Sequence, residues 1–262
     1  MLMQKFKTLA GICFLLLALF TTNANAAKRE FYEIKIYHIK NTEQGERVEN
    51  YLKNAFIPAM HRAGFKHVGV FKPVLKDTTS GKQIYVLTTY KALDQLVGLH
   101  KTLEKDQKYL ADGKDYLDAV YSNPPYERIE TTVLHAFEKR PMLKASQLSG
   151  AKSDRIYELR SYESHTEKIH RNKVRMFNDG DEMGIFDRLG FNPVFYGEVV
   201  SGKTMPNLMY LTTFEHQASR DAHWKAFTND EEWAKLKVRP EFQNNVSKNI
   251  QKFLYPTEYS DL

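Results

Sequence analysis

One short string of residues occurs twice in this chain and defines how the chain is built. Leu-Thr-Thr followed by an aromatic residue spans residues 87–90 and returns 124 residues later at 211–214. The likeness extends outward, because Phe-Tyr-Glu-Ile-Lys-Ile-Tyr at 31–37 corresponds to Ile-Tyr-Glu-Leu-Arg-Ser-Tyr at 156–162. The chain therefore contains two copies of one unit of roughly 110 residues, and the fold of one copy predicts the fold of the other.

Each copy has the same order of predicted elements. Alternating apolar and polar residues indicate strands, and apolar residues three or four apart indicate helices. In the first copy these patterns predict strands at 30–39, 65–74, 83–90 and 128–137, with helices at 43–62 and 92–119. In the second copy they predict strands at 155–162, 192–201, 207–214 and 247–255, with helices at 166–189 and 217–238. The order β-α-β-β-α-β is that of a ferredoxin-like unit, so the expected class is α+β.

A ferredoxin-like unit places its helices on one face of its sheet. The other face of each copy then needs a cover, and the sheet of the second copy is the natural one. We therefore expect the two sheets to pack face to face and to enclose a pocket between them.

The chain divides into four predicted segments. They are a secretory signal at 1–26, a first domain at 29–138, a linker at 139–153 and a second domain at 154–262. Lys5 and Lys7, an apolar run at 9–20 and Ala24-Asn25-Ala26 are typical of a cleaved signal, which predicts export to the periplasm or beyond the cell. The alternative is that the signal is retained as an anchor.

Charge and cysteine content limit the classes of function. The formal net charge is +6, and removal of the predicted signal with its two lysines lowers it further. This mild charge is spread along the chain, whereas nucleic-acid binding calls for a clustered basic surface, so we expect no nucleic-acid partner. The one cysteine, Cys13, falls inside the predicted signal, so the exported protein is expected to depend on its core alone rather than on disulfides.

Strand alternation predicts a polar wall. On the first strand of each copy, one side of the strand carries the polar or phenolic residues Glu33, Lys35 and Tyr37 or Glu158, Arg160 and Tyr162. Assigning the apolar side to the helices turns this polar side toward the space between the sheets. Because charged groups there are costly unless paired, they should bond one another. One interpretation is a ligand site in which Arg160 holds a carboxylate; the other is an internal network that only fixes strand register.

Two further residues extend the predicted ligand site in the second copy. Tyr210 lies on the strand expected to neighbour the wall, whereas the first copy has Val86 at that position. Trp224 shares a helical face with Arg220 and Phe227, which favours either a packed aromatic stripe or a lid over the pocket. The second copy is therefore the better candidate for function.

We expect neither a metal site nor a bound cofactor. The pairs His165 with His170 and His216 with His223 lack the spacing of four residues that lets two helical imidazoles share a zinc ion. With no cysteine outside the predicted signal, thiolate ligands are also excluded.

The second copy resembles the NIPSNAP family. The resemblance rests on Tyr157, Glu158, Leu159, Arg160, Leu189, Gly190, Phe191, the run 206–214, Arg220, Trp224, Phe227, Trp233, Tyr255 and Pro256. It is weaker in residues 29–138, where Tyr109 stands in place of the second tryptophan. The resemblance implies that the two repeats form a pseudo-dimeric version of the dimeric α/β barrel. Animal members of the family are mitochondrial and are linked to vesicle traffic and protein contacts, and related barrel families include cofactor-free monooxygenases.

Two kinds of function remain open. The first is binding of a small organic or carboxylate ligand, or of a protein partner or second copy of the chain, in or beside the barrel. The second is a cofactor-independent monooxygenase or isomerase acting on an aromatic or polyketide-like substrate, which needs an enclosed apolar cavity with one or two placed polar groups. A filled barrel would favour a structural or partner-binding role, and an open cavity with unpaired polar groups would favour a ligand.

Overall fold

A computed structural model describes residues 28–262, and its strands follow the predicted order in both repeats. The predicted signal and Cys13 lie outside the described residues. The strands of the first repeat are β1 (Phe31–His38), β2 (Val68–Pro73), β3 (Gln83–Tyr90) and β4 (Arg128–Ala136). Those of the second are β5 (Ile156–Glu163), β6 (Asn192–Ser201), β7 (Asn207–Phe214) and β8 (Lys248–Pro256). The prediction of two β-α-β-β-α-β units in an α+β fold is confirmed.

Each long predicted helix is divided into shorter ones. The first repeat has α1 (Thr42–Tyr51), a π-helical turn (Leu52–Phe56), α2 (Ile57–Arg62), α3 (Leu93–Leu103), α4 (Gln107–Asp112) and α5 (Lys114–Leu117). The second has α6 (Glu167–Asn178), α7 (Glu182–Arg188), α8 (Gln217–Thr228) and α9 (Glu231–Leu236), and short 3-10 turns occur at Lys152–Asp154 and Pro240–Phe242. The π-helical turn lies just before Pro58, whose missing N–H removes one regular helical hydrogen bond. Among residues 28–262, no helix combines the length and apolar character needed to cross a membrane.

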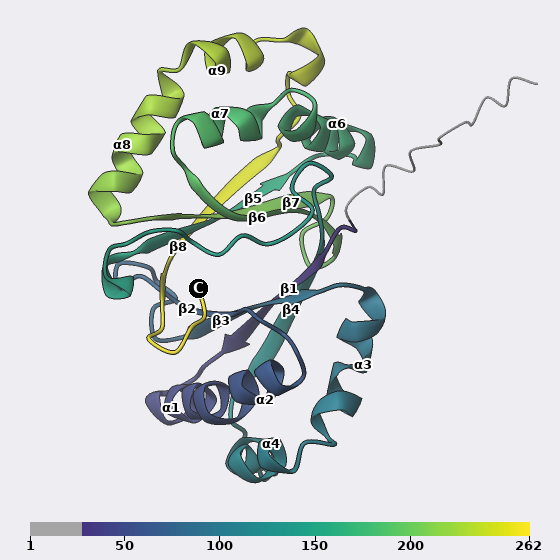
Figure 1. Ribbon diagram of the computed structural model, residues 1–262, viewed down its shortest axis with the longest axis vertical. Helices are drawn as coiled ribbons and strands as arrows, with labels where there is room; N and C mark the ends of the chain where they lie inside the picture. Colours follow the sequence, from purple (N-terminus) through teal and green to yellow (C-terminus); the bar gives the residue numbers. More distant parts are fainter. Residues whose placement is uncertain (1–27) are drawn as a thin grey trace, which may run out of the picture.

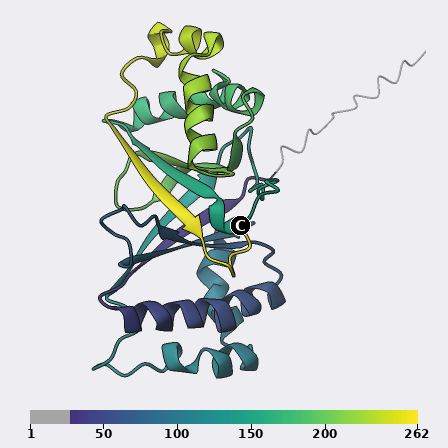
Figure 2. The same ribbon diagram turned by 90° about the vertical axis from the view of Figure 1, so that its left-hand side faces the viewer.

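The eight strands close into one antiparallel barrel. Their order around the barrel is β1-β3-β2-β8-β5-β7-β6-β4, so each repeat contributes four neighbouring strands. The repeats join at two seams, where β2 pairs with β8 and β4 pairs with β6. In Figure 1 the helices of the two repeats lie at opposite ends of the molecule with the strands between them, and Figure 2 shows the same division after a quarter turn. Closure within one chain confirms the pseudo-dimeric barrel.

The segments that follow each repeat extend both seams. After β4, Phe137 and Lys144 donate backbone hydrogen bonds to Tyr196 and Val194 of β6. After β8, the backbone of Thr257 donates in the same way to Val70 of β2, and Asp261 donates to Val68. The segment that follows each repeat therefore hydrogen-bonds to a strand of the other repeat. Residues 139–147 of the predicted linker lie along the barrel.

The barrel interior is a filled apolar core. Residues from both repeats meet there, among them Ile34, Phe71, Leu159, Phe195, Leu211 and Leu254. The void left at the centre is about 10 Å³. That is at the lower limit of what one water molecule needs, so the interior has no room for a ligand.

The predicted orientation of the polar wall is wrong. Tyr157 and Leu159 face the barrel interior, whereas Tyr162 and Tyr210 pack in the core beneath the helices of the second repeat. In the first repeat, Tyr37 likewise packs under the helices. From the sequence alone, the helices were expected to pack against the apolar side of the strand. Helices can cover a charged strand face when they bring partners of opposite charge, and they do so here.

Candidate functional site

The candidate site is built around the carboxylate of Glu158, the third residue of β5. Glu158 is fully buried and accepts four hydrogen bonds. Arg160 Nε donates to Oε1 at 2.7 Å, and Arg220 donates from Nη2 to Oε1 at 2.8 Å and from Nε to Oε2 at 2.9 Å. The indole N–H of Trp224 donates to Oε2 at 2.7 Å. The predicted pairing of Glu158 with Arg160 is confirmed, and α8 supplies the two partners that the sequence did not assign to it.

Arg160 is held flat against an aromatic ring. Its guanidinium carbon lies 3.6 Å from the centre of the Trp224 ring, a cation–π arrangement. Burial alone would lower the pKa of Arg160, but Tyr210, Tyr162 and Glu158 nearby raise it above its ordinary value, so the side chain stays charged. Nη1 donates to the Tyr162 hydroxyl at 3.1 Å. Within residues 28–262, no hydrogen bond is formed by Nη2, so one end of the guanidinium keeps unused donors.

The tyrosines form a second layer behind the arginine. The hydroxyls of Tyr162 and Tyr210 lie 2.8 Å apart, and their rings meet edge to face. Burial raises the pKa of Tyr210 well above its ordinary value, so its phenol stays protonated. A chain of hydrogen bonds therefore leads from Glu158 through Arg160 and Tyr162 to Tyr210, and it fixes the position of the guanidinium.

A cavity of about 630 Å³ opens beside this network, between β5 and the helices of the second repeat. Arg160, Tyr162 and Trp224 line it, while Glu158 and Tyr210 lie behind its wall. The other lining residues are Lys173, Met176, Glu182, Arg220, Phe227, Thr228, Trp233, Lys237, Phe242, Gln243, Asn244, Asn245, Val246 and Asn249. We call this space the Trp224 cavity.

The lining combines positive charge with aromatic surface. Arg160, Lys173, Arg220 and Lys237 are cationic, against the single carboxylate of Glu182. Five of the lining residues are aromatic, and they include both tryptophans of the chain. Such a surface suits a ligand that has an anionic group and a flat apolar body.

A buried ion pair in this wall was not predicted from the sequence. Lys173 of α6 and Glu182 of α7 are both buried and lie 2.8 Å apart. Lys173 Nζ also lies 4.7 Å from the centre of the Phe177 ring. A usable signal was present, because Lys173 falls three residues before Met176 on the apolar face of its helix. The loop residues 243–246 carried no such signal, since their position depends on the path between α9 and β8.

The predicted residues of the first repeat do not join this site. Glu33, Lys35 and Tyr37 lie on β1, under the helices at the other end of the molecule (Figure 1). Glu33 accepts a hydrogen bond from the Tyr90 hydroxyl at 2.9 Å, and Lys35 lies 3.7 Å from it. The eight predicted site residues therefore form two separate groups, and only the second-repeat group adjoins the Trp224 cavity.

Tyrosine rings fill the corresponding space in the first repeat. Tyr37 and Tyr109, which correspond to Tyr162 and Trp233, pack with Tyr51 and Tyr116. The rings of Tyr51 and Tyr116 stack with centres 3.7 Å apart. The position that corresponds to Trp224 is His100, which is exposed. The repeats have kept one fold but have diverged in the space between sheet and helices.

No metal centre is evident in the described part of the chain, where no three His, Cys, Asp or Glu side chains come together as ligands.

Comparisons with known proteins give structural relatives for the whole fold and a family match for the second repeat. The model of the NIPSNAP family matches residues 157–261. A search of curated proteins found no match. Among solved structures, a proposed monooxygenase from Lactobacillus acidophilus aligns with 87% of this chain and 94% of its own, at 11% identity and a TM-score of 0.57.

Two more solved structures are similar. An anthrone oxidase-like protein aligns with 88% of this chain and 93% of its own, at 8% identity and a TM-score of 0.51. A NIPSNAP-like domain protein from Burkholderia xenovorans aligns with 42% of this chain and 91% of its own, at 18% identity and a TM-score of 0.38. At these identities the full-length matches show a shared fold and no more. Residues 157–261 are thus a NIPSNAP-family domain, which here forms one half of a closed two-repeat α/β barrel.

Proposed function

We propose that this protein binds a small organic carboxylate with an aromatic or other flat apolar body in the Trp224 cavity. The observation that carries the proposal is the state of Arg160, which lines the cavity while its Nη2 donates no hydrogen bond within residues 28–262. A carboxylate placed there would accept hydrogen bonds from Nη2, and the charge on the guanidinium would strengthen them.

The rest of the wall supports the same ligand class. Glu158 and Asp221 together balance the charges of Arg160 and Arg220, whereas Lys237, which also lines the cavity, pairs with no carboxylate of residues 28–262 and adds one positive charge. Trp233 and Phe242 are placed to contact an apolar body, and the amides of Asn244 and Asn245 line the loop side. A cavity of about 630 Å³ falls in the usual size range for small-molecule sites.

The chain contains its own reporter for this binding. Both of its tryptophans line the cavity, so the intrinsic tryptophan fluorescence should change when an aromatic carboxylate such as 2-naphthoate enters. Arg160→Gln should weaken 2-naphthoate binding at least about ten-fold, because a hydrogen bond to a charged group is lost. The neutral analogue 2-naphthamide, whose carbonyl oxygen can still accept a hydrogen bond but carries no charge, should lose less affinity in the variant than 2-naphthoate does.

The matched control is Lys35→Gln. Lys35 occupies the position in β1 that Arg160 occupies in β5, but it lies under the helices of the first repeat. This control should leave the fluorescence titration unchanged. Equal weakening by both substitutions, or no weakening by Arg160→Gln, would rule out Arg160 as the carboxylate anchor.

A cofactor-independent oxygenase or isomerase is the alternative function. Its support is the full-length fold likeness to proteins described as a proposed monooxygenase and as anthrone oxidase-like. The geometry of the site supports this enzymatic function less well than it supports ligand binding. Glu158 already accepts four hydrogen bonds and so is a poor general base. Binding of a carboxylate is accordingly the function that the contacts support best.

A further inference from the structure

The buried ion pair in the wall of the Trp224 cavity has no part in holding the ligand carboxylate. Lys173 is 4% exposed and Glu182 is 2% exposed, and both line the cavity. Lys173 Nζ donates to Glu182 Oε2 at 2.8 Å and to the Met176 sulfur at 3.3 Å. The ammonium group is therefore held in place by contacts within the wall.

The fold does not require charges at these two positions. Counted from the N-cap of the first helix in each repeat, Lys173 corresponds to Val48. Counted back from the Arg-x-Gly-Phe sequence that follows these helices in both repeats, Glu182 corresponds to Phe56. Val48 and Phe56 are both buried in the core of the first repeat. Because a buried ion pair is often no more stabilising than apolar residues of similar volume, stability alone does not account for this one.

One oxygen of Glu182 remains open to the cavity. Oε2 accepts the hydrogen bond of Lys173, whereas Oε1 accepts none from residues 28–262. Oε1 is also not among the unpartnered atoms that the described residues enclose completely, so it keeps surface that a bound molecule can reach. Lys173 already balances the charge of the carboxylate. The open oxygen therefore suits a neutral hydrogen-bond donor, such as a hydroxyl, better than a second cation.

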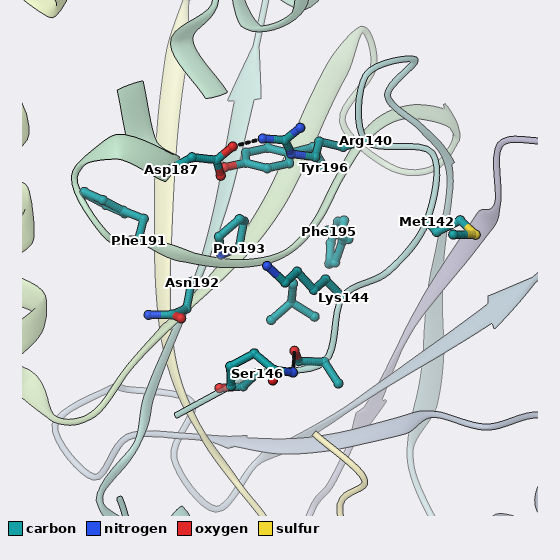
Figure 3. Close-up of a pocket in the computed structure, with 13 residues that line it drawn as sticks. Arg140, Met142, Lys144, Ser146, Asp187, Phe191, Asn192, Pro193, Phe195 and Tyr196 are labelled. Atoms are coloured by element: carbon teal, nitrogen blue, oxygen red, sulfur yellow. Dashed lines mark hydrogen bonds and ion pairs between the residues drawn. The ribbon is translucent and has the colours of Figure 1, made fainter. Parts of the chain in front are cut away.

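The other ion pair of α7 provides a contrast. Figure 3 shows Asp187 paired with Arg140 beside a separate cavity of about 420 Å³, between linker residues 140–147 and the first residues of β6. Both side chains of this pair are partly exposed, so water can reach them, and neither lines the Trp224 cavity. The Arg140–Asp187 pair is therefore a matched control for the buried pair.

We propose that Glu182 determines specificity, and that the ligand of the Trp224 cavity is an aromatic carboxylate that also carries a hydroxyl group. This inference rests on the proposed function: Arg160 holds the carboxylate, and the hydroxyl donates a hydrogen bond to Glu182 Oε1. Tyr162 connects the two anchors, because its hydroxyl accepts from Arg160 at 3.1 Å and its ring centre lies 5.6 Å from Lys173 Nζ. Both anchors thus act on one ligand in one cavity.

The test compares hydroxy and methoxy ligands. A hydroxyl at position 5, 6 or 7 of 2-naphthoate samples different separations between the carboxylate and the donor, and each methoxy counterpart has the oxygen without the hydrogen. In isothermal titration calorimetry the best hydroxy isomer should bind about ten-fold tighter than 2-naphthoate, as expected for a hydrogen bond to a charged group, and its methoxy counterpart should gain nothing. No gain for any hydroxy isomer, or an equal gain for its methoxy counterpart, would overturn the inference. Failure of 2-naphthoate itself to bind would instead contradict the proposed function.

A paired replacement assigns the gain to Glu182. Lys173→Met together with Glu182→Leu exchanges the ion pair for apolar residues, which is what the first repeat has at these positions. The preference for the hydroxy ligand over the methoxy ligand should disappear in this variant. The control, Arg140→Gln together with Asp187→Asn, removes the other ion pair of α7 and should keep the preference. A preference that persists without Lys173 and Glu182 would show that the hydroxyl binds elsewhere. Because the preference is a ratio of affinities within one variant, weaker binding of the carboxylate alone does not mimic its loss.

Discussion

Glu158→Gln should lower the free energy of unfolding by about 3–5 kcal/mol, because it removes the carboxylate that two arginines share. Arg160, which is only 7% exposed, would then have no carboxylate partner among residues 28–262 and would lie close to Arg220, whose other partner is Asp221. A glutamine side chain has the same shape, but its amide N–H groups would face the N–H groups of an arginine on at least one side. Urea denaturation of the variant and the original protein at neutral pH measures the difference.

The control for this effect is Glu33→Gln. Glu33 occupies the corresponding position in β1, but within residues 28–262 its carboxylate bonds only to the Tyr90 hydroxyl and to Lys35, whose side chain is 24% exposed. Its loss should cost about 1–2 kcal/mol, in the range of an ordinary hydrogen bond. Equal losses for the two substitutions would show that the arginines and Trp224 do not bind the Glu158 carboxylate as described.

Leu159→Ala should be the second most damaging change, with an expected loss of about 2–5 kcal/mol. Leu159 lies opposite Leu211 in the register of β5 and β7, and both side chains belong to the core inside the barrel. The interior is already filled, so removal of three carbon atoms leaves a cavity that the closed ring of strands cannot easily collapse to fill. Urea denaturation measures this loss as well.

The same variant separates the barrel interior from the ligand site. Leu159 faces away from the Trp224 cavity, so the affinity of folded Leu159→Ala for 2-naphthoate should stay within about two-fold of the original, as expected for independent sites. A large loss of affinity at unchanged stability would mean that the ligand enters the barrel, as the sequence argument first supposed.

The fold could be predicted from the sequence because its signals are local and occur twice. Alternation along residues 83–90 and 207–214 matches β3 and β7 to the residue, and the repeat itself supplies the second half of the barrel. The grouping of Glu158, Arg160 and Tyr162 on one side of a strand was equally local. The side that faces the helices could not be predicted from local sequence, because it depends on the residues that α8 places opposite β5, namely Arg220 and Trp224.

The remainder of the site depends on segments far apart in the chain. Lys173, Glu182 and Phe242 reach one cavity only after three helical segments have packed. The filling of the first repeat by Tyr51 and Tyr116 likewise required the positions of two helices that are distant in sequence. A sequence pattern gives the face of a strand, whereas a cavity is set by the lengths and packing of the helices that cover it.

The central claim is that the ligand site lies outside the barrel, between β5 and the helices of the second repeat. A crystal grown with 6-bromo-2-naphthoate tests it directly, because anomalous scattering locates the bromine atom. We predict a bromine peak in the Trp224 cavity, with the naphthoate carboxylate at Arg160. A peak among Leu159, Leu211 and Phe71 inside the barrel, or none beside Trp224 at saturating ligand, would contradict the account.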